Sequence, residues 1–312
     1  MSWFILSLIC MLGWGFADLF YKLGTDETDF LSHLKIAVWV GLVMGVCACG
    51  LIPFSEGFGG GALKGFVKYL PASLSYIVSM VIGYAGLRYL EMSIVSPVQN
   101  ASGALSAICM LMWFSVRGGG GEGFTLLDMG GTALIVLGVI LLAVVENRLN
   151  DIDEADKKYR LGAKALLFPL LYCVFDTLGT AADGIILDES SGLNLGEIDV
   201  LILYGFTFLL AGGAAWIYML IKTRHAYNPF AKGELKKGAA ALCEEAGQIF
   251  YVYAMAARPV LAAPMVASYC VVSVALSAIF AGERLKKAQY ACVFLVVWGI
   301  IALGISEGLG EL

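Results

Sequence analysis

The sequence predicts an all-α integral membrane protein with ten transmembrane helices, arranged as two inverted five-helix repeats. Three observations lead to this prediction: long apolar segments recur from end to end, charged residues are scarce, and the two halves share a residue pattern. Of the 312 residues, 60% are hydrophobic and 14% are charged, whereas soluble domains average about a quarter charged residues. Such a chain cannot cover itself with polar surface, so we expect the lipid bilayer to surround it.

The apolar segments define the expected helices. A hydrocarbon core of about 30 Å needs about 20 helical residues at a rise of about 1.5 Å each. In chain order, the expected spans are residues 3–23, 33–53, 69–89, 93–115, 125–145, 164–187, 199–221, 238–257, 260–281 and 289–306. The polar connections between them are too short to hold a soluble domain. We expect residues 1–148 to form the first repeat, residues 149–160 a polar linker and residues 161–312 the second repeat.

The two halves carry matching residues in the same order. Residues 14–18 in the first span align with residues 172–176 in the sixth, and both begin with an aromatic residue and end with aspartate. Residues 94–98 align with residues 261–265, each with a proline near the start of the fourth span of its half. Because each half has an odd number of spans, the second half enters the membrane in the opposite direction. Inverted repeats place a binding site near the bilayer midplane and expose it alternately to either side.

Several short motifs resemble one transporter superfamily. They are Trp14-Gly15, the segment Tyr84 to Tyr89, Ser96-Pro97, and Gly282-Glu283-Arg284-Leu285 followed by Gln289 and Gly299. With these residues the chain resembles the drug/metabolite transporter (DMT) superfamily, and within it the ten-helix EamA-like proteins. The resemblance implies a multi-pass protein of the cell (plasma or inner) membrane that moves small metabolites without ATP hydrolysis. It also implies cytoplasmic termini, although the lysine and arginine residues, most of which lie in loops opposite the termini, favour the reverse orientation.

Acidic residues inside the spans are the main site candidates, because a charge at the bilayer centre costs roughly 2.5 to 3.5 kcal/mol on insertion scales. Asp18 and Asp176 occupy equivalent positions in the repeat, and we expect both to face the seam between the halves. The alternative for Asp18 is an ion pair with Lys22, four residues further along the same helix. Asp183 lies two turns beyond Asp176, near further acidic residues, and is expected at the membrane interface.

Glu244 and Glu245 are adjacent, so on a helix they point about 100° apart and at most one faces the pathway squarely. Glu244 shares a face with Gln248 and Tyr251, a polar stripe that is typical of a cavity wall. The alternatives are that Arg88 satisfies Glu244, or that Glu245 is the cavity residue instead. The sequence leaves this choice open.

Amides and aromatic rings complete the predicted site. Gln99 and Asn100 follow a proline that interrupts backbone hydrogen bonding, and their side chains both donate and accept. Aromatic rings around a carboxylate form a cage that suits an organic cation, although buried amides and rings also serve only to hold helices together. The predicted substrate-binding residues are Asp18, Asp176, Glu244, Glu245, Trp14, Tyr172, Gln99, Asn100, Gln248, Tyr84 and Tyr269.

The sequence favours transport over catalysis. It has no nucleophile elbow, phosphate-binding loop or histidine-glutamate metal motif, so we expect no catalytic residues, metal or cofactor. The net charge of −5 argues against a nucleic-acid partner. We expect a secondary active transporter of a small polar metabolite, with a cationic solute or with protons or sodium as the coupling ion. The alternatives are a neutral solute such as an amino acid or sugar, with structural acids, and a non-transporting receptor or accessory subunit.

Overall fold

The computed structural model is a bundle of α-helices. It describes all residues except 27, 56–57, 91, 118–124, 151–164, 166, 189–194, 282–285 and 311–312, and its described part contains no β-strand. The Gly282 to Leu285 motif and residues 151–160 of the expected linker lie outside the described residues. The helices are α1 Trp3–Gly24, α2 Ser32–Leu51, α3 Phe58–Gly86, α4 Met92–Asn100, α5 Ser102–Arg117, α6 Leu126–Asn150, α7 Leu167–Leu187, α8 Glu197–Thr223, α9 Leu235–Ala257, α10 Pro259–Ala267, α11 Tyr269–Leu276 and α12 Lys287–Gly310.

All ten expected spans contain helix, with two differences in detail. The fourth and ninth spans are each divided in two, at Ala101 and at Ser268. We expected the first of these breaks at Pro97, but α4 continues through that residue to Asn100. The third helix begins at Phe58 rather than near residue 69, so a glycine-rich stretch is helical despite the low helix propensity of glycine.

Many of the helices, and much of the outer surface of the bundle, are apolar. Among the described residues, seven helical segments are long and apolar enough to cross a membrane: Trp3–Gly24, Ser32–Phe54, Lys64–Gly86, Leu167–Leu187, Glu197–Thr223, Pro259–Phe280 and Lys287–Leu309. Large apolar side chains also point outwards from these helices, including Leu12, Val174 and Phe294, each more than half exposed. An apolar outer surface of this extent is typical of contact with lipid.

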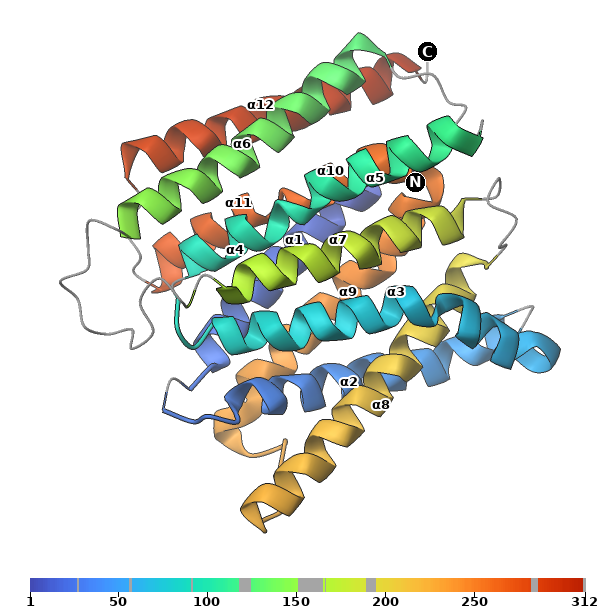
Figure 1. The fold of residues 1–312 in the computed structure, drawn as a ribbon, viewed down its shortest axis with the longest axis vertical. Coiled ribbons are helices and arrows are strands. Elements are labelled where there is room, and N and C mark those ends of the chain that lie inside the picture. The colour runs from blue at the N-terminus through green and yellow to red at the C-terminus, as the bar shows by residue number, and fades with distance from the viewer. Residues whose placement is uncertain are drawn as a thin grey trace.

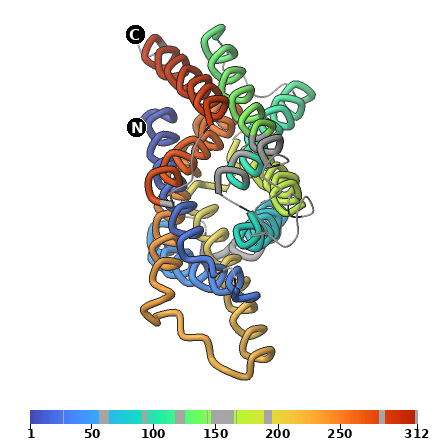
Figure 2. The backbone as a smooth tube through the Cα atoms, turned by 90° about the vertical axis from the view of Figure 1, so that its left-hand side faces the viewer, coloured from blue at the N-terminus to red at the C-terminus, as the bar shows by residue number. Residues whose placement is uncertain are grey.

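The largest helix interfaces join the two halves of the chain. They pair α2 with α8, α1 with α9, α6 with α12, α3 with α7 and α5 with α10. In Figure 1 the α6–α12 pair lies at one end of the bundle and the α2–α8 pair at the other. Figure 2 shows the same arrangement from the side, with the connection between α8 and α9 at the end opposite α6 and α12. The remaining helices lie between these two outer pairs.

Close contacts at glycines show that equivalent helices of the two halves run in opposite directions. A Cβ atom on Gly41 would lie 3.0 Å from the Cα of Gly212, and one on Gly205 would lie 2.5 Å from the carbonyl oxygen of Met44. Later residues of α2 thus meet earlier residues of α8. In the same way Gly131 and Gly138 of α6 pack against successively earlier residues of α12.

The first helices of the two halves are antiparallel as well. Lys22, near the end of α1, donates hydrogen bonds of 2.9 Å to the carbonyl oxygens of Leu87 and Leu90. Phe168, at the start of α7, stacks on Tyr89 with ring centroids 5.4 Å apart. The end of α1 and the start of α7 therefore lie at the same side of the bundle.

The contact between α2 and α8 leads to a prediction about stability, and the neighbouring Gly213 provides the control. Gly212→Ala would place a Cβ 2.9 Å from the carbonyl oxygen of Ala37, a backbone atom that cannot swing away. We expect a loss of about 1–3 kcal/mol from overpacking, seen as a lower melting temperature in detergent. Gly213→Ala, whose Cβ would meet nothing within 4 Å, should be neutral or stabilising because alanine favours helix. Equal melting temperatures for the two variants would contradict this packing.

Candidate functional site

A polar cavity lies in the middle of the bundle, between the outer helix pairs. It is lined from both halves, by α1, α3, α4 and α5 and by α7, α8, α9, α10 and α11, and has about 870 Å³ of empty space including the part open to solvent. Ten of the eleven predicted residues line it: Trp14, Asp18, Tyr84, Gln99, Asn100, Tyr172, Asp176, Glu244, Gln248 and Tyr269. Their role in binding stays a prediction, but their convergence in space is a property of the fold.

The two adjacent glutamates lie in different surroundings. Glu244 is 2% exposed and its carboxylate lines the cavity. Its Oε2 accepts hydrogen bonds from the hydroxyl of Tyr21 and, at 3.1 Å, from that of Tyr84. Glu245 does not line the cavity; its carboxylate interacts instead with Cys47 of α2. Glu245 therefore lies outside the cavity lining, because adjacent residues on a helix face different neighbours.

Arg88 packs on aromatic rings rather than against the carboxylate of Glu244. Its guanidinium lies over the rings of Phe30 and Tyr89, 5.4 Å and 5.5 Å from their centroids. These rings belong to the turn after α1 and to the end of α3. The two tyrosine hydroxyls satisfy Glu244 without a positive charge.

Serine hydroxyls hold the two repeat-equivalent aspartates. Oδ2 of Asp18 accepts hydrogen bonds of 2.8 Å from both Ser96 and Ser273. Oδ2 of Asp176 accepts one of 2.6 Å from Ser102. Each aspartate thus contacts a divided helix of the opposite half, Asp18 through α11 and Asp176 through α5. Asp18 makes these contacts in place of the alternative ion pair with Lys22. The Lys22 ammonium instead donates to backbone carbonyl groups just after α3.

Two buried amides in the cavity have free hydrogen-bonding capacity. Nε2 of Gln99 and Nε2 of Gln248 are buried and have no hydrogen-bond partner among the described residues, and both residues line the cavity. Asn100 differs, because its Nδ2 donates to the carbonyl oxygen of Ser96 at 2.7 Å. Buried polar atoms are rarely left without a partner. The two glutamines can therefore donate to acceptor atoms of a bound solute.

Aromatic side chains form one wall of the cavity. Nε1 of Trp14 donates to the backbone carbonyl of Glu244 at 3.1 Å, and its ring lies 5.1 Å from Tyr251 and 5.6 Å from Tyr269. Gly247 makes room for the indole, because a Cβ there would overlap Cδ1 of Trp14. The rings therefore face the same space as the carboxylate of Glu244.

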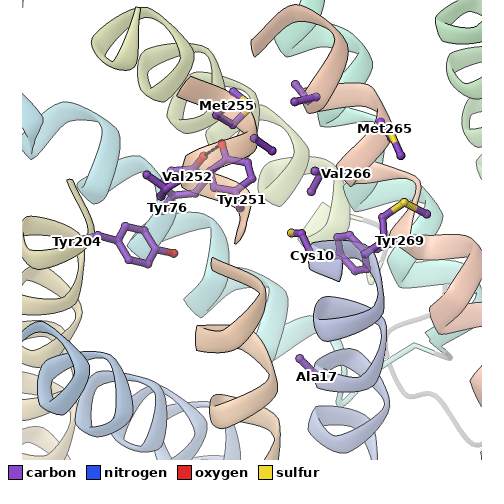
Figure 3. Packing of buried hydrophobic residues seen from close by; sticks show 14 of the residues in the cluster. Cys10, Ala17, Tyr76, Tyr204, Tyr251, Val252, Met255, Met265, Val266 and Tyr269 are labelled. Atoms are coloured by element: carbon purple, nitrogen blue, oxygen red, sulfur yellow. Dashed lines mark hydrogen bonds between the residues drawn. The ribbon is translucent and has the colours of Figure 1, made fainter. Parts of the chain in front are cut away.

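A group of tyrosines from three helices closes another side. The hydroxyls of Tyr76 and Tyr251 lie 2.6 Å apart, and Tyr76 also donates to Oγ1 of Thr180 at 3.2 Å. Figure 3 shows the rings of Tyr76 and Tyr251 side by side, with Tyr204 pointing towards the same region from α8. These hydroxyls both donate and accept, so they can pass on a hydrogen bond or a proton between neighbours.

The charges of the cavity are all negative. Asp18, Asp176 and Glu244 line it, and no lysine, arginine or histidine does so in the part of the chain that the structure describes. Such a lining attracts a cation or requires protons on the carboxyl groups.

Basic residues gather instead outside the cavity. There, Nζ of Lys35 lies 2.7 Å from Oδ2 of Asp29, and Nζ of Lys237 lies 2.6 Å from Oε2 of Glu234. Partial burial opposes ionisation of Asp29, but hydrogen bonds from Lys35 and from the backbone of Leu31 outweigh it and lower the pKa of this carboxyl. This cluster joins the turn before α2 to the start of α9.

Sequence reasoning missed three residues that hold the carboxylates. Tyr21 lies three residues after Asp18 and seven after Trp14, so helical spacing alone could have placed it on the same face of α1. Ser102 and Ser273 carry no such signal. They reach the aspartates only through the packing of α5 against α7 and of α11 against α1.

The comparisons with known proteins inform the fold alone. No family model and no curated protein matches the sequence. Among solved structures, 28 chains match the fold. One of them, described only as the crystal structure of a protein, superposes with a TM-score of 0.64 at 12% sequence identity and covers 97% of this chain and 96% of its own. The chain therefore shares its overall fold with a solved protein over nearly its full length.

Proposed function

We propose that this chain is a multi-pass protein of the cell membrane and a secondary active transporter of a small organic cation. The observation that carries the proposal is the central cavity with three carboxylates and no basic residue among its described lining residues. A cation bound there would replace the missing counter-charge, and the aromatic wall around Trp14 would add cation–π attraction. Protons or sodium would serve as the coupling ion.

The antiparallel relation of equivalent helices supports alternating access. The pairs α2–α8 and α6–α12, and the helices α1 and α7, run in opposite directions, as two inverted five-helix repeats require. Rocking of one half against the other would open the cavity to each side in turn. The seven apolar segments of spanning length and the resemblance to EamA-like proteins of the DMT superfamily agree with this reading.

One observation favours a neutral solute as the second candidate. The free amides of Gln99 and Gln248 offer donors to hydroxyl or carbonyl groups, as an amino acid or sugar carries. In that case the carboxylates would be protonated or purely structural.

A set of matched ligands separates these proposals. Putrescine, 1,4-butanediol and succinate have the same carbon chain length but carry positive, no and negative charge. We expect putrescine and choline to raise the melting temperature of the purified protein, because a ligand that binds only the folded state stabilises it. The uncharged and anionic analogues should not.

Uptake of radiolabelled putrescine and choline into proteoliposomes, with and without a pH gradient, then tests transport itself. Stabilisation by butanediol as strong as that by putrescine would overturn the cationic reading and favour a neutral solute. Stabilisation by the cations without uptake would favour a receptor or accessory subunit.

A further inference from the structure

A fourth carboxylate lies deep in the bundle, outside the cavity lining. We expected Asp183 at the membrane interface, but it is 0% exposed. Among the described residues, no hydrogen bond of ordinary geometry reaches either of its carboxylate oxygens, although the hydroxyls of Tyr69, Tyr76 and Tyr251 lie close enough to interact with them. None of the ion pairs between described residues includes it. The expectation failed because the end of α7 packs inside the bundle, against α3, α5 and α9.

Tyrosine hydroxyls surround this carboxylate from three helices. Tyr69 and Tyr76 of α3 and Tyr251 of α9 face it closely, and Tyr204 of α8 lies further away. The hydroxyl of Tyr69 is also buried and without a hydrogen-bond partner.

Two further observations describe the surroundings of Asp183. Asp176, two turns earlier on the same helix, is an acid whose charge acts on Asp183. The three atoms that would lie nearest to a Cβ on the adjacent Gly184 belong to Met110, Met255 and Pro259, none of which titrates.

An ionised Asp183 would be costly in this environment. A buried charge loses its hydration, and tyrosine hydroxyls replace only part of it, so a carboxyl group in such a place tends to neutralise. A metal ion would need several converging ligands, and no group of three or more acidic, histidine or cysteine side chains that could hold one occurs among the described residues. A single proton neutralises the carboxyl without further ligands.

A line of hydroxyls connects this carboxyl to the cavity. Asp176, Thr180 and Asp183 lie at positions i, i+4 and i+7 of α7, on one face of the helix. The Tyr76 hydroxyl bonds to both Thr180 and Tyr251, and Tyr76 and Tyr251 line the cavity while they also face Asp183. A hydroxyl that rotates can donate to the carboxylate in one state and accept from the protonated carboxyl in another.

We propose that Asp183 is a proton-binding site, separate from the solute cavity and linked to it through the hydroxyls of Tyr76, Tyr251 and Thr180. The proposal deepens the proposed function, on which it rests, by assigning the coupling ion as a proton and giving it a residue. The proton sits on Asp183 in the conformation seen here. Binding of a cation at Asp176 turns the tyrosine hydroxyls and favours release of that proton through them to water in the open part of the cavity.

Infrared difference spectroscopy of the full chain in lipid tests the site with the proton itself as the probe. At neutral pH the wild type should show the carbonyl band of a protonated carboxylic acid, and Asp183→Asn should lack that band. Asp183→Glu should restore it. Asparagine is close to neutral aspartic acid in shape, so an unchanged melting temperature serves as the check on folding. An identical carboxylic-acid band in wild type and Asp183→Asn would overturn the proposal.

Proton release on solute binding tests the link to the cavity. Addition of putrescine or choline to weakly buffered protein should release protons from the wild type, and this release should be lost in Asp183→Asn although both ligands still raise its melting temperature. Release that is unchanged in Asp183→Asn would refute the link. Stabilisation by sodium chloride that depends on Asp183, without a carboxylic-acid band, would instead make it a sodium site and overturn the assignment of the proton. If neither cation binds the wild type, the proposed function fails, while the band still decides whether Asp183 holds a proton.

Discussion

Glu244→Gln is expected to reduce the uptake of putrescine and choline by at least about tenfold. Hydrogen bonds to charged groups contribute about 1.5–3 kcal/mol, and each 1.4 kcal/mol corresponds to about a factor of ten in affinity. Glutamine keeps the size of the side chain and can still accept hydrogen bonds from Tyr21 and Tyr84. The loss would therefore come from the missing charge rather than from a collapsed cavity.

The adjacent residue supplies the matched control for this variant. Glu245→Gln removes the same charge from the same turn of α9, but from the side that faces Cys47 rather than the cavity. We expect its uptake to stay near that of the wild type. Initial rates in proteoliposomes with equal protein content measure both variants. If Glu245→Gln were the more damaging change, the assignment of Glu244 to the pathway would be wrong.

Asp18→Asn and Asp176→Asn are expected to cause losses of similar size, because the two aspartates occupy equivalent places in the two halves. Each variant removes one of the three negative charges of the cavity. Asparagine can still accept the serine hydrogen bonds at Asp18 and Asp176, so the helix contacts should survive. Uptake over a range of pH values, with and without a pH gradient, measures the effect.

The pair of aspartates also permits a test of coupling between the halves. Residues that share one cavity deviate from additivity, by about 0.5–3 kcal/mol in contacting or networked pairs. We expect the double variant to lose less than the product of the two single losses, because either single change already removes most of the cation site. Transport by Asp176→Asn as efficient as that of the wild type at every pH would contradict a role for this carboxylate.

The sequence was sufficient to predict the helices and the three carboxylates that line the cavity. Apolar runs of spanning length have few alternatives to helix, which is why all ten expected segments contain one. The match between residues 14–18 and 172–176 pointed to Asp18 and Asp176 as a pair, and both line the cavity. The polar stripe from Glu244 to Tyr251 marked the cavity face of α9 by helical spacing alone.

The remaining features depend on how the helices rotate and pack. Helical spacing allowed either Glu244 or Glu245 to face the cavity, and the packing of α9 against α2 leaves Glu244 in its lining and Glu245 beside Cys47. Asp183 looked interfacial because acidic residues follow it, yet the tyrosines that bury it come from α3, α8 and α9. The break at Ala101, four residues after Pro97, is likewise not marked by any residue at the break itself.

Counterflow is the most direct test of a single cation site that faces the two sides of the membrane in turn. Proteoliposomes are loaded with unlabelled putrescine or choline and diluted into a trace of the same labelled cation, without a pH gradient. Alternating access predicts that the labelled cation rises transiently above its equilibrium level inside, since the returning site is more often occupied by unlabelled solute. A monotonic approach to equilibrium, or no entry of either cation at all, would contradict the account.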